Sequence, residues 1–393
     1  MGDAAADELV VVCGTTPWDG VTSARRKVAV PLSAHRPVLF VDPPVSPLTS
    51  LRSTLHRRTL AHTKLNKVAD RIWRLQPVVT PGKDRPGLRR LADRGLNRAI
   101  RSAVESLGLP VAAVVAALPT RPVFDAVEAR VRCYWITDDH VAGARLYGLN
   151  PDVVDAGERW LSDRADVLLG ASEDLVDRWR GRGHPNVQHF PNGADVELFS
   201  RAGQSIPQDF PPVPAGASGT VGFVGVMCDR IHVPLLRAVA DKGVHVMLIG
   251  PRRSSYDDPE FDALLEHPLV SWLGPRKPDE LPAYLHAFDV GLIPYAMTAY
   301  NHASSPLKLY EYLAAGLPVV TTPIAPFREL GPPLATLAED PELFAKAALD
   351  AMGTRSDSAA VRARRDFAAA NSWTSRAAAL ADALQLTGQP APH

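Results

Sequence analysis

Residues 301–322, NHASSPLKLYEYLAAGLPVVTT, are the stretch from which the rest of the chain can be interpreted. Ser304 and Ser305 are residue types that cap helices. Pro306 suits a first helical turn, because the N–H that proline lacks would have no partner there. Gly316 ends the helix, Pro318 prevents it from continuing, and the apolar residues that follow predict a buried parallel strand. The stretch therefore predicts a helix leading into a strand, as in an α/β protein.

Two charged residues of this helix lie on one face, close to its N-terminus. Lys308 and Glu311 are three residues apart, and the free N–H groups at a helix N-terminus attract anions. A cation and a helix end suit a diphosphate, and a carboxylate can accept hydrogen bonds from ribose hydroxyls, so the pattern indicates a nucleotide-sugar site. The alternative interpretation is a capped helix with a surface ion pair that contributes little stability.

This segment resembles the donor-binding signature of GT-B glycosyltransferases, in the mostly retaining group 1 (family 4-like) family that includes cell-wall, capsule and teichuronic-acid enzymes. The shared pattern is Pro-x-Lys-x-x-Glu-x-x-Ala-x-Gly-x-Pro-Val, matched here by Pro306, Lys308, Glu311, Ala314, Gly316, Pro318 and Val319. The full Glu-x7-Glu form of the motif has a second glutamate, which contacts the transferred sugar. Its position is Ala303 in this chain, so the resemblance leaves that contact and the identity of the sugar open.

The resemblance implies a set of donor-binding residues. It places Lys308 and Arg230 on the phosphates, where they would be catalytic by stabilising the leaving group, and Glu311 on the ribose. Gly225 would let the backbone approach the phosphates closely. The complete predicted donor site is Gly225, Arg230, Ser305, Pro306, Leu307, Lys308 and Glu311.

Composition is compatible with a folded protein of two or more domains. The chain has 393 residues, 46% of them hydrophobic, and a formal net charge of +0, so no overall charge recruits nucleic acid. Cys13, Cys133 and Cys228 sit in or beside apolar runs without disulfide or zinc spacing, which favours buried thiols in a reducing compartment. The N-terminus has no signal-peptide layout, and no apolar run approaches the ~20 residues of a membrane span. We expect a cytoplasmic protein.

Short apolar runs alternate with helix-compatible segments along the whole chain, the pattern of doubly wound α/β domains. The fold class we predict is α/β of the GT-B type, with two Rossmann-like domains, an interdomain cleft and a C-terminal helix that crosses back. A turn at 191–195 resembles the family's last N-domain turn, and proline-rich residues follow it. The predicted divisions are an acceptor domain at 1–200, a linker at 201–219, a donor domain at 220–366, and a returning helix and tail at 367–393.

Two loops of the first domain carry candidate acceptor-binding residues. Trp18 and Asp19 follow the first strand in a loop that resembles the Pro-Trp-Asp opening of some cell-wall transferases, although Trp18 also fits an ordinary packing role. Asp138, Asp139 and His140 follow a later strand, at the edge where this fold places chemistry. Adjacent carboxylates on an extended chain point to opposite faces, so we expect no metal site there.

Residues 51–101 are strongly basic, with fourteen Lys or Arg against three Asp, and leucines interleave with the cations near helical spacing. Such a surface can lie on anionic lipid. The alternative is a solvated, arginine-rich face. Nucleic-acid binding is disfavoured because the rest of the chain is neutral and shows no recognition module.

The predicted activity is transfer of a hexose from a UDP-, GDP- or dTDP-sugar to a hydroxyl, with no cofactor and no obligatory metal. The resemblance implies retention of configuration. An inverting enzyme would instead need a base, for which Asp19 and then Asp139 are the candidates. The acceptor would be a cell-envelope or lipid-linked glycan, or a small natural product. The alternatives are a GT-B-fold nucleotide-sugar epimerase or hydrolase, and a non-catalytic binding protein.

Overall fold

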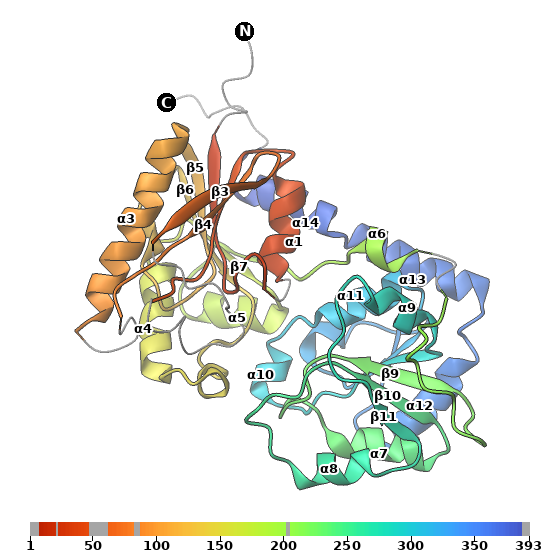
Figure 1. The fold of residues 1–393 in the computed structure, drawn as a ribbon. Helices are drawn as coiled ribbons and strands as arrows, with labels where there is room; N and C mark the ends of the chain where they lie inside the picture. Colours follow the sequence, from red (N-terminus) through yellow and green to blue (C-terminus); the bar gives the residue numbers. More distant parts are fainter. Residues whose placement is uncertain (1–7, 21–22, 47–61, 82–86, 202–204, 387–393) are drawn as a thin grey trace. The chain divides into compact units, whose positions relative to one another are not determined.

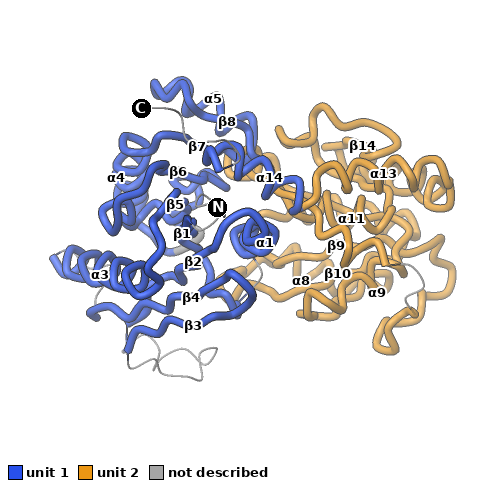
Figure 2. Tube along the Cα trace, turned by 90° about the horizontal axis from the view of Figure 1, so that it is seen from above, with its two compact units in different colours: residues 1–191, 373–393 blue, residues 192–372 orange. Residues whose placement is uncertain are grey.

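The computed structural model describes residues 8–20, 23–46, 62–81, 87–201 and 205–386. These residues form two compact units, coloured separately in Figure 2: residues 1–191 with 373–393, and residues 192–372. The structure therefore divides the chain somewhat earlier than the predicted linker at 201–219. The chain returns to the first unit at Trp373 rather than within a single helix that begins at 367.

The first unit is built on an eight-stranded sheet of order β3-β4-β2-β1-β5-β6-β7-β8, in which every neighbouring pair is parallel except β3 and β4 (Figure 1). Its strands are β1 (Leu9–Cys13), β2 (Val38–Val41), β3 (Lys64–Ala69), β4 (Ile72–Gln76), β5 (Val111–Ala116), β6 (Val131–Ile136), β7 (Val167–Gly170) and β8 (Val187–His189). The switch in strand order lies between β1 and β5, which are buried along most of their length. In a doubly wound sheet, ligands bind beside the carboxyl ends of the strands at such a point.

Helices lie on both sides of this sheet, with α3 on one side and α1 with α14 on the other (Figure 1). They are α1 (Ala24–Leu32), α3 (Arg89–Leu107), α4 (Pro151–Ser162), α5 (Glu173–Gly181) and α14 (Trp373–Ala383), with 3₁₀ turns η2 (Val123–Asp125) and η3 (Ala144–Tyr147). The C-terminal helix α14 packs against α1, so residues far apart in sequence join one core.

The second unit contains a six-stranded parallel sheet of order β11-β10-β9-β12-β13-β14. The strands are β9 (Thr220–Val224), β10 (His245–Ile249), β11 (Val270–Trp272), β12 (Val290–Ile293), β13 (Val319–Thr321) and β14 (Ala335–Leu337). Its helices are α6 (Val196–Phe199), α7 (Val233–Asp241), α8 (Pro259–Leu265), α9 (Leu281–His286), α10 (Ala299–His302), α11 (Leu307–Ala314), η4 (Ala325–Phe327), α12 (Pro341–Met352) and α13 (Ser358–Ala370). This strand order is that of a dinucleotide-binding sheet, with its switch point between β9 and β12. The predicted fold class, α/β with two Rossmann-like domains, is confirmed.

Several local predictions differ from the structure. Residues 121–129 are compatible with a helix in composition but form only the short turn η2, beside which two side chains of α3 donate to backbone carbonyls. Arg89 donates to the carbonyl of Thr120 at 2.7 Å, and Asn97 donates to that of Pro122 at 3.1 Å. The antiparallel hairpin of β3 and β4 falls in the basic segment and was not predicted, since the exposed residues of β3 show no apolar alternation.

Within the part of the chain that the structure describes, no helix combines the length and the apolar character needed to cross a bilayer.

Candidate functional site

The residues of the donor signature gather at the switch point of the second unit. Gly225 follows the carboxyl end of β9, Tyr295 follows that of β12, and α11 leads into β13, the strand next to β12. This is the edge of a doubly wound sheet at which nucleotides bind. The sheet order thus brings together residues that are 80 positions apart in sequence.

Gly225 makes room for the side chain of Lys308. A Cβ atom at position 225 would lie 2.5 Å from Lys308 Cε and 2.7 Å from Phe223 Cζ, closer than real Cβ contacts. The ammonium of Lys308 lies 5.9 Å from the centre of the Phe223 ring, within the range of a cation–π contact. Glycine at 225 therefore has a structural reason besides the predicted close approach of backbone to phosphate: it lets the lysine lie across the end of β9.

Lys308 and Glu311 are both half-buried. Across the described ranges, neither side chain forms an ion pair, with the other or with any other residue. The alternative of a surface ion pair between them is therefore wrong. Because no ion pair engages either side chain, both charges remain available to a ligand that supplies the complementary groups.

The helix α11 begins without a side-chain cap. Its N-cap residue is Pro306, and the prediction that Ser304 or Ser305 caps it is wrong. Both hydroxyls are used elsewhere: Ser304 Oγ donates to the carbonyl of Asn301 at 2.8 Å, and Ser305 Oγ accepts from the backbone N–H of Asn192 at 3.2 Å. The side chain of Asn192 also donates to the carbonyl of Ser305. These contacts position the start of α11 and leave its first N–H groups uncapped by any side chain.

Arg230 is held in place by several neighbours. Its Nε donates to Asn301 Oδ1 at 2.7 Å, its Nη2 donates to Ser304 Oγ at 3.0 Å, and its guanidinium lies 4.5 Å from the centre of the Tyr295 ring. Asn301 is fully buried and donates in turn to the carbonyl of Arg230 at 3.1 Å. No role was predicted for Asn301 or Tyr295. Their positions beside the signature and just after a strand were the only signals available.

Ala303, at the position of the motif's missing glutamate, is 1% exposed. It follows α10, immediately before Ser304. The site therefore has a buried methyl group where the motif has a carboxylate.

The predicted acceptor residues Trp18 and Asp19 lie in a loop held by charge pairs. The backbone N–H of Trp18 donates to Asp42 Oδ1 at 2.9 Å, and the indole packs edge-on against Phe40 with ring centres 5.1 Å apart. Arg74 forms ion pairs with both Asp42 and the exposed Asp19. Trp18 is thus a buried packing residue, as its alternative interpretation stated, and the carboxylate of Asp19 has a fixed partner.

The second predicted acceptor group follows β6. Asp139 is buried, pairs with Arg178 at 2.6 Å and accepts from the backbone N–H of Ala142 at 3.1 Å. Burial lowers the pKa of His140 to about 4, so its imidazole is neutral near pH 7. Asp138 is half-buried beside them.

Polar atoms near this strand end lack hydrogen-bond partners. His140 Nε2 and Trp135 Nε1 are both buried with no partner among the residues described. The guanidinium of Arg25, also buried, donates to Thr137 Oγ1 at 2.7 Å and lies 5.4 Å from the centre of the Trp135 ring. These groups could receive hydroxyls of a substrate. In the described ranges, no cluster of three or more His, Cys, Asp and Glu side chains is arranged to hold a metal ion.

Comparison with known proteins gives three kinds of match. Residues 220–353 match the family described as glycosyl transferases group 1. The protein named "Putative teichuronic acid biosynthesis glycosyltransferase TuaH" of Bacillus subtilis (strain 168) is 30% identical over 230 residues. The match covers 56% of this chain and 57% of that relative, so the chain matches little more than half of the relative's length.

Solved structures resemble nearly the whole chain. The sucrose-phosphate synthase of Thermosynechococcus elongatus has a TM-score of 0.72 at 14% identity, covering 96% of this chain and 98% of its own. HepE of Anabaena, solved with UDP and glucose, has a TM-score of 0.64 at 15% identity, covering 96% and 99%. A trehalose-6-phosphate protein of E. coli, solved with UDP-2-fluoro glucose, has a TM-score of 0.66 at 15% identity, covering 98% and 100%. At these identities the likeness shows the fold, which is GT-B.

Proposed function

We propose that this GT-B chain, whose residues 220–353 form a group 1 glycosyl transferase domain, moves a hexose from a nucleoside-diphosphate sugar to an acceptor hydroxyl. The observation that carries the proposal is the pair Lys308 and Glu311: two half-buried charges without ion-pair partners in the described residues, at the switch point of a nucleotide-binding sheet. Arg230, held by Asn301 and Ser304, supplies a further positive charge in the same unit.

Each of these groups has a role in the proposed reaction. Departure of a nucleoside diphosphate puts negative charge on phosphate oxygens, and positioned cations that meet this charge lower the barrier. Lys308 and Arg230 are the proposed cations, assisted by the uncapped start of α11 with Ser305, Pro306 and Leu307. The Glu311 carboxylate accepts hydrogen bonds from the ribose hydroxyls.

For the donor we propose a UDP-hexose, because two of the structural neighbours were solved with UDP or a UDP-sugar. We further propose retention without a metal. In that mechanism the leaving phosphate accepts the proton of the attacking hydroxyl, and the side-chain cations offset the charge. The pairing of Asp139 with Arg178 and of Asp19 with Arg74 supports retention, since each candidate base already faces an arginine where it would have to meet the acceptor hydroxyl.

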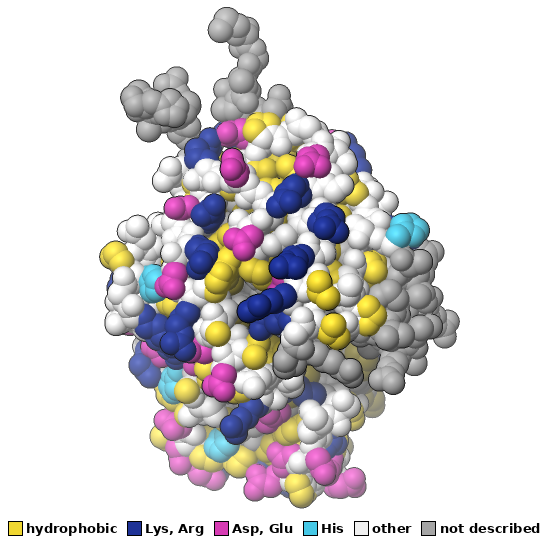
Figure 3. All heavy atoms as spheres, turned by 90° about the vertical axis from the view of Figure 1, so that its left-hand side faces the viewer, with side chains coloured by type: hydrophobic (Ala, Val, Ile, Leu, Met, Phe, Trp, Pro, Cys, Tyr) yellow, Lys and Arg dark blue, Asp and Glu magenta, His cyan; other side chains and the backbone are white. Residues whose placement is uncertain are grey.

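For the acceptor we propose a glycan of the cell envelope, in line with the relative's name, and hold a small natural product as the alternative. Arginines of α3 favour peripheral contact with anionic lipid at the inner face of the membrane: Arg90, Arg94, Arg98 and Arg101 are exposed. Figure 3 shows Lys and Arg side chains gathered on the face of the first unit that carries α3. Flotation with anionic vesicles at low and high salt tests this contact, and binding that is absent at low salt would exclude it.

The first experiment is a thermal-shift panel of UDP, GDP, dTDP and ADP, with and without EDTA. A ligand at a hundred times its dissociation constant stabilises the folded state by about 2.7 kcal/mol. We expect UDP to raise the melting temperature equally with and without EDTA. A shift that EDTA abolishes would contradict metal independence, and no shift from any nucleotide would contradict the donor site.

Gly225→Ala tests whether UDP binding depends on the position of Lys308. The added methyl group must displace Lys308 or Phe223, so we expect the dissociation constant of UDP to rise about tenfold, which is about 1.4 kcal/mol. Gly331→Ala is the matched control, because a Cβ at 331 meets no atom within 4 Å. Equal UDP affinity in both variants would show that the position of Lys308 does not matter for the nucleotide.

A second candidate function is binding of nucleotide sugars without transfer. It is supported by the buried Ala303, which stands where the motif has its sugar-contacting carboxylate. Product analysis with UDP-glucose decides between the two, with and without acceptor. Binding without turnover supports the second candidate, and sugar release or epimerisation without acceptor supports a hydrolase or epimerase.

A further inference from the structure

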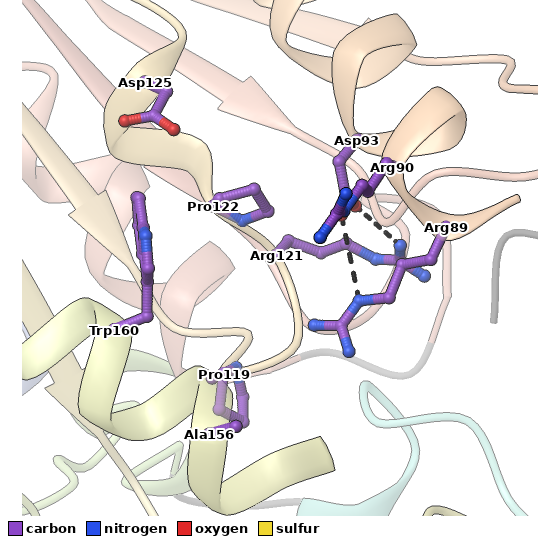
Figure 4. Close-up of a pocket in the computed structure, with 10 residues that line it drawn as sticks. Arg89, Arg90, Asp93, Pro119, Arg121, Pro122, Asp125, Ala156 and Trp160 are labelled. Carbon is purple, nitrogen blue, oxygen red and sulfur yellow. Dashed lines mark hydrogen bonds and ion pairs between the residues drawn. The ribbon is translucent and has the colours of Figure 1, made fainter. Parts of the chain in front are cut away.

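The first unit contains an open pocket of about 520 Å³ (Figure 4). None of the residues predicted for the donor or acceptor site lines it. It lies between the start of α3, the loop after β5, and α4. That loop leaves one of the two strands at the switch point of the first sheet. Pockets of a few hundred Å³ beside such a point are the usual size and place of a small-ligand site in this fold.

The backbone around the pocket is tightly held. A Cβ on Gly157 of α4 would lie 1.7 Å from the carbonyl oxygen of Pro119, so α4 packs directly on the loop. From the other side, Arg89 donates to the carbonyl of Thr120 at 2.7 Å, and Asn97 donates to that of Pro122 at 3.1 Å. The pocket is therefore preformed, which reduces the entropy lost on binding.

One side of the pocket carries an excess of positive charge. Arg121 is 4% exposed, and its Nη1 pairs with Asp93 at 2.8 Å. The same carboxylate lies 3.8 Å from Nε of Arg89, so two guanidiniums share one acid. Arg90 adds a third, as Figure 4 shows. Planar guanidiniums at a preformed wall match the oxygens of a carboxylate or phosphate.

The opposite side of the pocket is lined by ring side chains rather than by guanidiniums. Pro119, Pro122 and Trp160 line it with ring atoms, and Asp125 lies on the far side of Pro122 from the arginines (Figure 4). A ligand that fits both sides has an oxyanion at one end and a compact ring at the other. A bare anion would leave the ring-lined side unused, and a neutral sugar would not compensate the excess positive charge of three arginines beside one aspartate.

We propose that this pocket binds a negatively charged sugar unit of the acceptor, with its carboxylate or phosphate on Arg90 and Arg121 and its ring against Pro122 and Trp160. The identification of this ligand as part of the acceptor rests on the proposed glycosyl transfer. The pocket belongs to the first unit and the nucleotide site to the second, so the two can be tested separately.

The test is a ligand-observed NMR titration of the full chain with glucuronate, glucose 6-phosphate, glucose and inorganic phosphate. We expect both charged sugars to bind, glucose to bind at least tenfold more weakly, and phosphate to bind more weakly than glucose 6-phosphate. Equal binding of glucose and glucuronate would overturn the role of the arginines. Phosphate binding as tightly as glucose 6-phosphate would overturn the role of the ring-lined side.

Substitutions of arginines test whether glucuronate binds in this pocket. Arg90→Ala should weaken glucuronate at least threefold, whereas Arg94→Ala, an exposed arginine one turn further along α3 that does not line the pocket, should leave it unchanged. Equal effects of the two would show nonspecific attraction to a basic face and overturn the proposal. Arg121→Lys keeps the positive charge but loses the bidentate guanidinium, so glucuronate binding should weaken at least threefold. The melting temperature of the variant checks that it is folded.

The UDP thermal shift distinguishes this proposal from the proposed function. A normal UDP shift with no binding of either charged sugar overturns the pocket alone. Binding of charged sugars that Arg90→Ala weakens, in a chain that no nucleotide stabilises, upholds the pocket and overturns the transferase.

Discussion

The candidate bases of the first unit and the candidate donor-binding charges of the second unit differ in whether they are ion-paired. In the first, Asp19 and Asp42 share Arg74, and Asp139 pairs with Arg178. In the second, Lys308 and Glu311 have no ion-pair partner among the described residues. Paired charges hold loops together, whereas charges without an ion-pair partner remain available to a ligand. We therefore propose that the second unit binds the nucleotide and that the candidate bases of the first unit are mainly structural.

The largest effect is expected from Lys308→Ala. Loss of one positioned donor to a developing negative charge costs about 10²–10³-fold in kcat. The stability of the free protein should fall by no more than about 1 kcal/mol, because a cation–π contact with Phe223 is lost but no ion pair is. Steady-state kinetics and a thermal melt measure both. Lys346→Ala, which removes a lysine of the same unit from an exposed pair with Asp350, is the control. Retained turnover in Lys308→Ala would end the proposed phosphate role.

Glu158 tests the first unit through pH. It is buried beside Tyr134, whose hydroxyl donates to it at 3.0 Å, and burial raises the pKa of Glu158 to about 7 from an ordinary 4.5. Between these values the native state holds a proton that the unfolded state has lost. The free energy of unfolding should therefore fall by about 2 kcal/mol from pH 5 to pH 7, then level off.

Glu158→Gln removes this titration while keeping an oxygen for Tyr134. Urea denaturation at each pH gives the unfolding free energy of wild type and variant. Their difference isolates the contribution of the Glu158 titration from that of other groups such as His140. A difference that does not change with pH would show that Glu158 is ionised throughout.

Asp139→Asn distinguishes a structural acid from a catalytic base. The variant loses the charge that Arg178 faces but keeps an oxygen for the N–H of Ala142, so we expect about 1–2 kcal/mol of destabilisation. The value of kcat measured well below the melting temperature should change less than threefold. Asp177→Asn, which removes the charge of an exposed ion pair with Arg180 in the same unit, serves as the control. A large loss of kcat with unchanged stability would instead make Asp139 the base of an inverting enzyme.

The smallest effect is expected from Glu311→Gln. Hydrogen bonds to a carboxylate contribute more than neutral ones, so UDP affinity should fall about tenfold, measured by calorimetry. With 2′-deoxy-UDP the same substitution should cost less, because one hydroxyl is already absent. Glu329→Gln, exposed in the same unit, should change neither affinity. Equal losses for both nucleotides would place Glu311 away from the 2′-hydroxyl.

Much of the fold could be predicted because strands buried on both faces are continuous apolar runs. The continuous apolar runs at 111–118 and 290–294 coincide with β5 and β12 to within two residues. The hairpin of β3 and β4 could not be predicted, since the exposed face of β3 carries no apolar pattern. Nor could the short turn η2, because residues 121–129 are compatible in composition with a longer helix.

The order of most strands and helices, and the placement of Lys308 and Glu311 on one helical face, follow from local periodicity in the sequence. Which charges are paired depends on the tertiary structure. Arg74 meets Asp19 and Asp42 across 55 and 32 residues, and Gly225 receives the side chain of Lys308 from another element. Such contacts depend on sheet order and on the packing of elements distant in sequence, and neither is encoded in the pattern of any one segment.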